Sequence, residues 1–173
     1  MNPLLHLDAT PLVMTLCWWY VRRSFSLAAD SYAASATNRY TLYLVLLSNV
    51  LQMYYYFVVV VVLTILVALL FKMLLLEQVA QLADGKYPFS VESILRDRVF
   101  RAFSDPRHVA FHATMFVVIQ AYIYVMAFLV LPDEPSPVVK ENQIKTVLDT
   151  TLYVYLAGYV VWMGWMVFHE VVM

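Results

Sequence analysis

The stretch FVVVVVLTILVALLF, residues 57–71, determines the fold class of this chain. Its side chains are aliphatic or aromatic apart from Thr64, and the surrounding apolar block runs from Tyr40 to Leu76 with Lys72 as its single charge. A helix needs about 20 consecutive apolar residues to cross a hydrocarbon core about 30 Å thick. Because the block is longer than this, the sequence predicts a membrane-spanning helix here.

The composition of the whole chain agrees with a membrane protein. Of its 173 residues, 63% are hydrophobic and 13% are charged, whereas soluble domains are about 45–50% apolar and about 25% charged. The balance of 11 Lys and Arg against 12 Asp and Glu argues against nucleic-acid binding. Three glycines are too few for a Gly-rich phosphate-binding loop. The single cysteine, Cys17, excludes an internal disulfide and a cysteine-based zinc site.

We expect an all-α integral membrane protein with three transmembrane helices. Residues 40–84 are predicted to form one long helix that contains the first span, because no proline or glycine interrupts them and Gly85 can cap the C-terminus. At about 1.5 Å per residue this helix is more than twice as long as the hydrocarbon core is thick. The second span is predicted at 109–131 and the third at 147–173, with a loop rich in proline and charge at 132–146.

Two further segments are expected to lie at the membrane surface. Residues 86–107 place apolar and charged side chains on opposite sides of a helix, which predicts an amphipathic helix in the interface. Residues 1–39 contain the apolar run 12–21, which is too short to span and predicts an interfacial or re-entrant segment. The part from 24 to 39 is rich in Ser and Ala and poor in acids, which is typical of an organellar import signal.

Four arginines shortly before the second span are expected to contact lipid phosphates or acidic groups of a partner. The basic residues on the two sides of the membrane are nearly balanced in number, but these four are concentrated beside a span, where the positive-inside rule weighs charges most heavily. We therefore place the loop between the first and second spans on the matrix or cytoplasmic side. The four are Arg96, Arg98, Arg101 and Arg107.

Histidines are the candidate ligands for a metal or cofactor. His108 and His112 lie one helical turn apart, a spacing that suits a metal ion, but two ligands are too few. His112 and His169 are expected at the same end of antiparallel spans, the arrangement that ligates a b-type haem. We nevertheless expect no metal and no cofactor, because all three lie near span ends, where an imidazole reaches water at little cost. On this interpretation His108 and His112 face the headgroups beside Arg107, and His169 pairs with a neighbour or a lipid phosphate.

Small and polar residues define two candidate helix-packing faces. Membrane helices associate through small side chains and interhelical hydrogen bonds, so we expect these faces to meet protein rather than lipid. Within each face the residues recur at seven-residue intervals, with one further glycine beside the second set. They are Ala113, Gln120 and Ala127 on the second span, and Ala157, Gly164 and the adjacent Gly158 on the third.

No nucleophile and base can be placed in a catalytic motif, so we expect no enzyme. The expected function is a non-catalytic integral membrane subunit of a large multi-protein assembly, with other membrane subunits and lipids as partners. The composition of residues 24–39 favours a respiratory or ATP synthase complex of the mitochondrial inner membrane. Two alternatives stay open: a viral membrane protein beneath a capsid, and a small haem-binding, quinone-binding or transport protein that uses His112, His169 or Gln120.

Overall fold

The computed structural model describes residues 8–82, 101–103, 105–133 and 135–173. Within these ranges all regular structure is helical and no strand occurs. The elements are α1 (Thr10–Leu27), α2 (Ala29–Ser35), α3 (Arg39–Leu82), the short 3-10 helix η3 (Arg101–Phe103), α5 (Pro106–Val125), the π-helical turn η4 (Met126–Val130) and α6 (Pro137–Val172).

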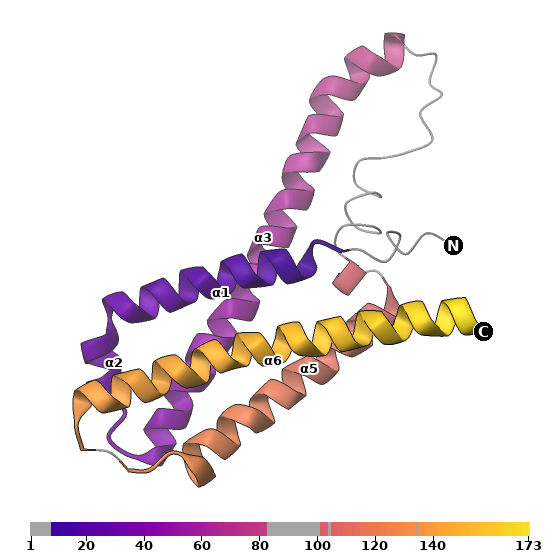
Figure 1. Cartoon of the computed structure of the whole chain (residues 1–173). Helices are drawn as coiled ribbons and strands as arrows, with labels where there is room; N and C mark the ends of the chain where they lie inside the picture. Colours follow the sequence, from indigo (N-terminus) through magenta and orange to yellow (C-terminus); the bar gives the residue numbers. More distant parts are fainter. Residues whose placement is uncertain (1–7, 83–100, 104, 134) are drawn as a thin grey trace.

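Helices α1, α3, α5 and α6 pack into one bundle (Figure 1). Helix α1 lies against α3 and α6, and α5 packs on both α3 and α6. Along each helix the buried side chains recur every three or four residues, the spacing that turns one face inward. Examples are Met14, Trp18, Val21 and Phe25 on α1, Leu46, Val50 and Met53 on α3, Ile119 and Ile123 on α5, and Ile144, Leu148 and Tyr155 on α6.

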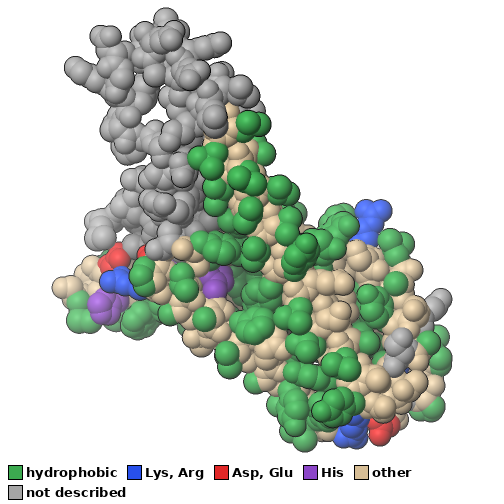
Figure 2. Space-filling view, turned by 180° about the vertical axis from the view of Figure 1, so that it is seen from behind, with side chains coloured by type: hydrophobic (Ala, Val, Ile, Leu, Met, Phe, Trp, Pro, Cys, Tyr) green, Lys and Arg blue, Asp and Glu red, His purple; other side chains and the backbone are tan. Residues whose placement is uncertain are grey.

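Three helical stretches are long and apolar enough to cross a membrane: Arg39–Val67, Pro106–Val130 and Pro137–Val172. They indicate a multi-pass membrane protein and confirm the predicted all-helical class with three candidate spans. In Figure 2 hydrophobic side chains cover most of the visible face of the bundle, and the charged side chains lie toward its ends. This distribution fits helices whose middles face hydrocarbon and whose ends face water.

Helix α3 is unbroken over 44 residues, a length of about 66 Å. The predicted long helix is therefore present, although its predicted end at Asp84 and Gly85 lies outside the described residues. Side chains of α3 are buried as far as Val61, whereas beyond it large side chains such as Leu63 and Leu66 are exposed. In Figure 1 the C-terminal part of α3 projects away from the other helices of the bundle.

The predicted loop at 132–146 is wrong for most of its length, because α6 begins at Pro137 rather than at Val147. Proline suits the first turn of a helix, where its missing N–H has no intrahelical partner. Glu141 and Lys145 then form an ion pair one turn apart on the helix surface. The charges that suggested a loop are accommodated by a helix that extends beyond the apolar segment.

The N-terminal helix is longer than the apolar run that was predicted as an interfacial or re-entrant segment. Residues 12–21 lie within α1, which has 18 residues and lies along the bundle over about 27 Å (Figure 1). Its depth in the membrane stays a prediction. Arg22 ends the apolar run in the sequence, but in the structure its Nε lies 2.8 Å from Oδ1 of Asp149 on α6. The positive charge of Arg22, which is unfavourable in a buried helix, is thus balanced by the carboxylate of Asp149 on another helix. Helix α1 is not one of the three candidate spans.

Helix α5 begins three residues before the predicted span. The carboxylate of Asp105 accepts a hydrogen bond from the backbone N–H of Arg107 at 2.9 Å, and Pro106 occupies the first turn. Both residues are typical of helix N-termini. The predicted amphipathic helix at 86–107 lies outside the described residues, apart from η3 and the start of α5.

Candidate functional site

A buried carboxylate and imidazole join the N-terminal segment to α5. Asp8 lies directly before α1, and its Oδ2 is 3.5 Å from Nδ1 of His108 in the first turn of α5. Both side chains are fully buried. The other carboxylate oxygen of Asp8 accepts hydrogen bonds from the backbone N–H of Thr10, at 2.6 Å, and from its hydroxyl. Because an ionisable group in an apolar interior needs partners, these contacts tie the chain before α1 to the bundle.

An aromatic ring of α6 packs against His108, and a ring of α5 stacks on it in turn. The ring of His108 meets Trp162 edge-on with centroids 6.4 Å apart, and Phe111 stacks on Trp162 at 5.4 Å. One turn further along α5, His112 lies against Tyr155 with centroids 5.8 Å apart. We call this group the buried polar cluster: Asp8, His108, His112, Tyr155 and Trp162.

In the buried polar cluster, Nε2 of His112, the hydroxyl of Tyr155 and Nε1 of Trp162 are buried and make no hydrogen bond with the described residues. A buried polar atom without a partner costs about 1–3 kcal/mol. The atoms therefore favour a water molecule or a small polar ligand between α5 and α6.

The residue types of the buried polar cluster limit its chemistry. Within the described part of the chain, no group of three or more His, Cys, Asp or Glu side chains is placed to hold a metal ion. A carboxylate beside imidazoles can bind and exchange protons, and ionisable groups inside a membrane commonly mark functional sites. Proton binding is the chemistry that this arrangement supports.

Known proteins offer no guide to this site. No family model matches the chain. No curated protein and no solved structure matches it either.

The two candidate haem ligands lie in different surroundings. His112 packs inside the bundle against Tyr155, whereas His169 is exposed and its ring centroid is 5.4 Å from that of Trp165. A cavity of about 510 Å³ beside His169 is lined also by Arg107 and Trp165, but His112 does not line it. A haem held by His112 and His169 would need both imidazoles at one cavity. The two histidines do not share the cavity beside His169.

The predicted position of His108 is wrong. We expected it to face the headgroups beside Arg107, but its side chain is fully buried. The reason is the carboxylate of Asp8, which lies 100 residues away in sequence and pairs with His108 only in the folded chain. A search for every acid that could pair with a histidine near a span end would have included Asp8, but no spacing rule selects it.

The four arginines predicted to contact headgroups are described only in part. Arg96 and Arg98 lie outside the described residues, and of Arg101 only its place in η3 is described. Arg107 is exposed at the start of α5, with Nη1 3.9 Å from Oε1 of Glu170 near the end of α6. An exposed arginine at a span end fits headgroup contact, which stays a prediction.

The three packing candidates on the second span do not share one environment. Ala127 is fully buried, Gln120 is half-buried and Ala113 is exposed. The amide nitrogen of Gln120 is buried and makes no hydrogen bond with the described residues. Along α5 and η4 the three residues therefore pass gradually from the surface to the interior.

The two glycines of the third span have opposite surroundings. A Cβ atom at Gly158 would lie 2.9 Å from Sδ of Met115, so α6 and α5 approach closely at this point. A Cβ atom at Gly164 would meet nothing within 4 Å, and Ala157 is exposed as well. Gly158 thus packs within the chain, whereas Ala157 and Gly164 lie on the outer surface of α6.

Proposed function

We propose that this chain is a non-catalytic, multi-pass subunit of a multi-protein assembly in a membrane. The observation that carries the proposal is the outer face of α6, where Ala157 and Gly164 are exposed at the spacing of two helical turns. Small residues allow a second helix to approach closely, and in lipid such approach is a main source of helix association. We call Ala157, Val160, Val161 and Gly164 the outer α6 face.

The flanking side chains give this face the shape of a contact surface. Val160 and Val161 are 70% and 72% exposed, and Phe168 follows one turn after Gly164 with 62% exposure. Large side chains beside small ones form the ridges and grooves into which another helix packs. A helix from a second subunit is therefore the partner we propose for the outer α6 face.

The exposed part of α3 supports the membrane location. Beyond Val61 its side chains Leu63, Leu66, Val67 and Leu70 are each about half exposed, at 50–56%. Apolar surface of this extent is unfavourable in water at about 25 cal/mol per Å². Lipid chains or the helices of other subunits would cover it without that cost.

We also propose the mitochondrial inner membrane as the location, within a respiratory or ATP synthase complex. The support is the Ser- and Ala-rich, acid-poor composition of residues 24–39. Import into isolated mitochondria tests it: the chain should become protected from added protease only while the membrane potential is maintained. Failure of import would remove this location and leave the assembly proposal intact.

The assembly proposal is tested by gentle solubilisation of the native membrane followed by native electrophoresis. The wild-type chain should migrate with other membrane proteins, which mass spectrometry would identify. Gly164→Leu should release the chain from that complex without reducing its membrane insertion, because it fills the surface where the partner helix lies. Ala121→Leu, a similar change at an exposed position of α5, is the matched control and should leave the complex intact. A complex unaffected by Gly164→Leu would contradict the proposal.

The buried polar cluster favours a second candidate function, proton-linked transport. Chains of buried ionisable side chains form proton pathways in many membrane proteins. Purified protein in liposomes that contain a pH-sensitive dye would show proton flux, and Asp8→Asn or His108→Gln would abolish it. If the wild-type protein produces no flux under an imposed pH gradient, this candidate fails.

A further inference from the structure

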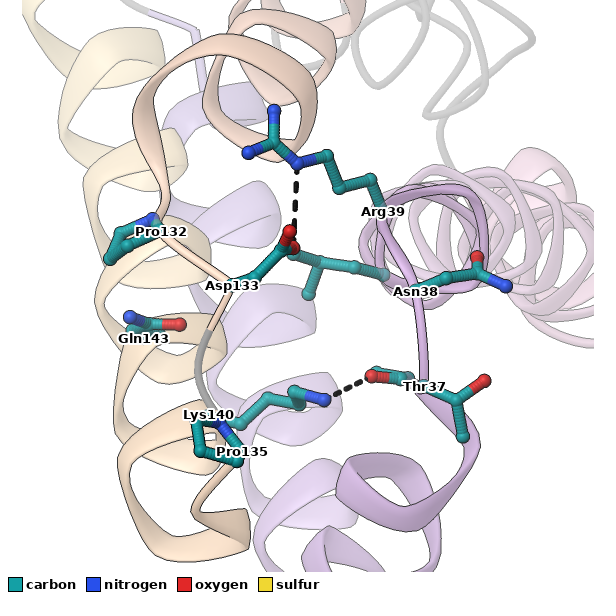
Figure 3. Close-up of a pocket in the computed structure, with 10 residues that line it drawn as sticks. Thr37, Asn38, Arg39, Pro132, Asp133, Pro135, Lys140 and Gln143 are labelled. Atoms are coloured by element: carbon teal, nitrogen blue, oxygen red, sulfur yellow. Dashed lines mark hydrogen bonds and ion pairs between the residues drawn. The ribbon is translucent and has the colours of Figure 1, made fainter.

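A polar cavity lies at the end of the bundle opposite the buried polar cluster. It has a volume of about 430 Å³ and lies between the α2–α3 connection and the α5–α6 connection. Figure 3 shows Arg39 and Asp133 reaching toward each other across this cavity, while Lys140 extends from α6 toward the α2–α3 connection. We call it the Arg39 cavity. Segments far apart in the sequence thus contribute two cations to the lining of one cavity.

Both cations are held in place and keep donors to spare. Nη1 of Arg39 donates a hydrogen bond to the carbonyl of Phe128 at 2.5 Å, and its Nε lies 3.4 Å from Oδ1 of Asp133. The ammonium of Lys140 donates to the carbonyl of Ala36. A guanidinium has five N–H donors and an ammonium has three, so each cation retains donors for a ligand. Two cations against one carboxylate leave the described lining with a positive charge.

The Arg39 cavity lies at the level where the candidate spans end. The first stretch begins at Arg39, the second ends at Val130 and the third begins at Pro137. Aromatic rings occupy the same level: Tyr40, which is 69% exposed, meets Phe128 edge-on with centroids 5.8 Å apart. Tyrosine prefers the boundary between headgroups and hydrocarbon, so a ligand in this cavity would lie at headgroup depth.

We propose that the Arg39 cavity binds the phosphate group of an anionic phospholipid. Arg39 and Lys140 would donate hydrogen bonds to its oxygens, as charge-assisted bonds to phosphate are short and strong. Leu42 and Pro132 supply apolar lining that suits the glycerol carbons. A choline headgroup would place a third positive charge beside these two cations, so anionic lipids should bind in preference to phosphatidylcholine. The proposal rests on the membrane location proposed above.

Replacement of Asp133 should change lipid binding in the opposite direction to replacement of either cation. Its side chain is 77% exposed and its contact with Arg39 is long at 3.4 Å, so the pair is of the weak, solvent-screened kind. A phosphate can displace this carboxylate from Arg39. Asp133→Asn should therefore strengthen lipid binding, whereas loss of either cation should weaken it.

The experiment is native mass spectrometry of the full chain in detergent, titrated with phosphatidylglycerol and separately with phosphatidylcholine. Each juxtamembrane cation contributes roughly a fivefold gain in affinity for anionic lipid. The double variant Arg39→Gln/Lys140→Gln should thus lose roughly 25-fold in phosphatidylglycerol binding, by the same rule. Arg23→Gln/Lys145→Gln removes the same charge from side chains that do not line the Arg39 cavity, and it should bind as the wild type does. Circular dichroism would confirm that all variants remain helical.

Three results would overturn the proposal. The first is equal binding of the two lipids by the wild-type protein, and the second is an equal loss of binding in the two double variants. The third is competition by sn-glycerol 3-phosphate in solution at the same concentration as the lipid, since it would identify a site for soluble phosphate compounds instead. Resistance of the wild-type chain to carbonate extraction from its native membrane tests the membrane location separately. An inserted chain without lipid preference would refute this proposal alone.

Discussion

The two ends of the bundle place charged side chains in opposite environments. At one end Asp8 and His108 are fully buried, and the ring of Trp162 meets that of His108 edge-on. At the other end Arg39 is about half exposed and Asp133 is largely exposed, with 44% and 77% of their side chains accessible. Charges interact more strongly, and are costlier to leave without a partner, where water is excluded. A similar contact can therefore hold the fold together at one end and stay available to a ligand at the other.

The largest effect is expected at the buried end. Asp8→Ala or His108→Ala should each destabilise the protein by about 3–5 kcal/mol, because each leaves the other group buried without its partner. Denaturant titration in detergent, followed by circular dichroism, measures this loss. The double variant should lose clearly less than the sum of the two single losses. Single losses below about 1 kcal/mol would mean that this pair is no stronger than an exposed one.

An intermediate effect is expected for the contact between α1 and α6. Arg22 lies 2.8 Å through Nε and 3.3 Å through Nη2 from the two carboxylate oxygens of Asp149, and both side chains are half-buried. Hydrogen bonds to charged groups of this geometry contribute about 1–2 kcal/mol. A double-mutant cycle with Arg22→Gln and Asp149→Asn should give a coupling free energy of that size. A coupling free energy near zero would mean that this contact is as weak as the exposed pair of Arg39 and Asp133.

The cap of α5 provides a test at the buried end that does not involve the Asp8 and His108 pair. Asp105 accepts a hydrogen bond from the backbone N–H of Arg107, and its replacement by Ala should cost about 1 kcal/mol. Asp105→Ser, which can accept the same bond, is the control and should restore most of the stability. If Asp105→Ala costs as much as Asp8→Ala, the large effect at this end is not specific to the buried pair.

The smallest effect is expected for Arg39 and Asp133. Their coupling free energy in a double-mutant cycle should lie below about 1 kcal/mol and should fall further when salt is added, because water and ions screen an exposed pair. The same measurement on Asp8 and His108 should show little dependence on salt. If the coupling free energy of Arg39 and Asp133 is as large as that of Asp8 and His108, burial does not separate the two ends of the bundle in the way described.

Predictions that depend only on neighbouring residues, such as helix length and apolar runs, agree with the structure. The length of α3 follows from the absence of helix breakers after Tyr40, and the three candidate spans follow from runs of apolar side chains. The predicted start of α6 is wrong because charged residues are common in loops as well as on helix surfaces, and here Glu141 and Lys145 pair on a helix. The candidate site was missed because its acid, Asp8, lies far from His108 in sequence.

Sequence by itself determined that this protein is built from long apolar helices, because helix propensity and hydrophobic length are properties of contiguous residues. Only the tertiary structure decided which glycine packs inside and which faces outward. Gly158 and Gly164 have similar sequence surroundings, but the rotation of α6 places Met115 against the first and no atom near the second. Likewise, the depth of His108 depends on where α1 begins relative to α5. Such contacts depend on how distant segments are oriented, which hydrophobic periodicity does not specify.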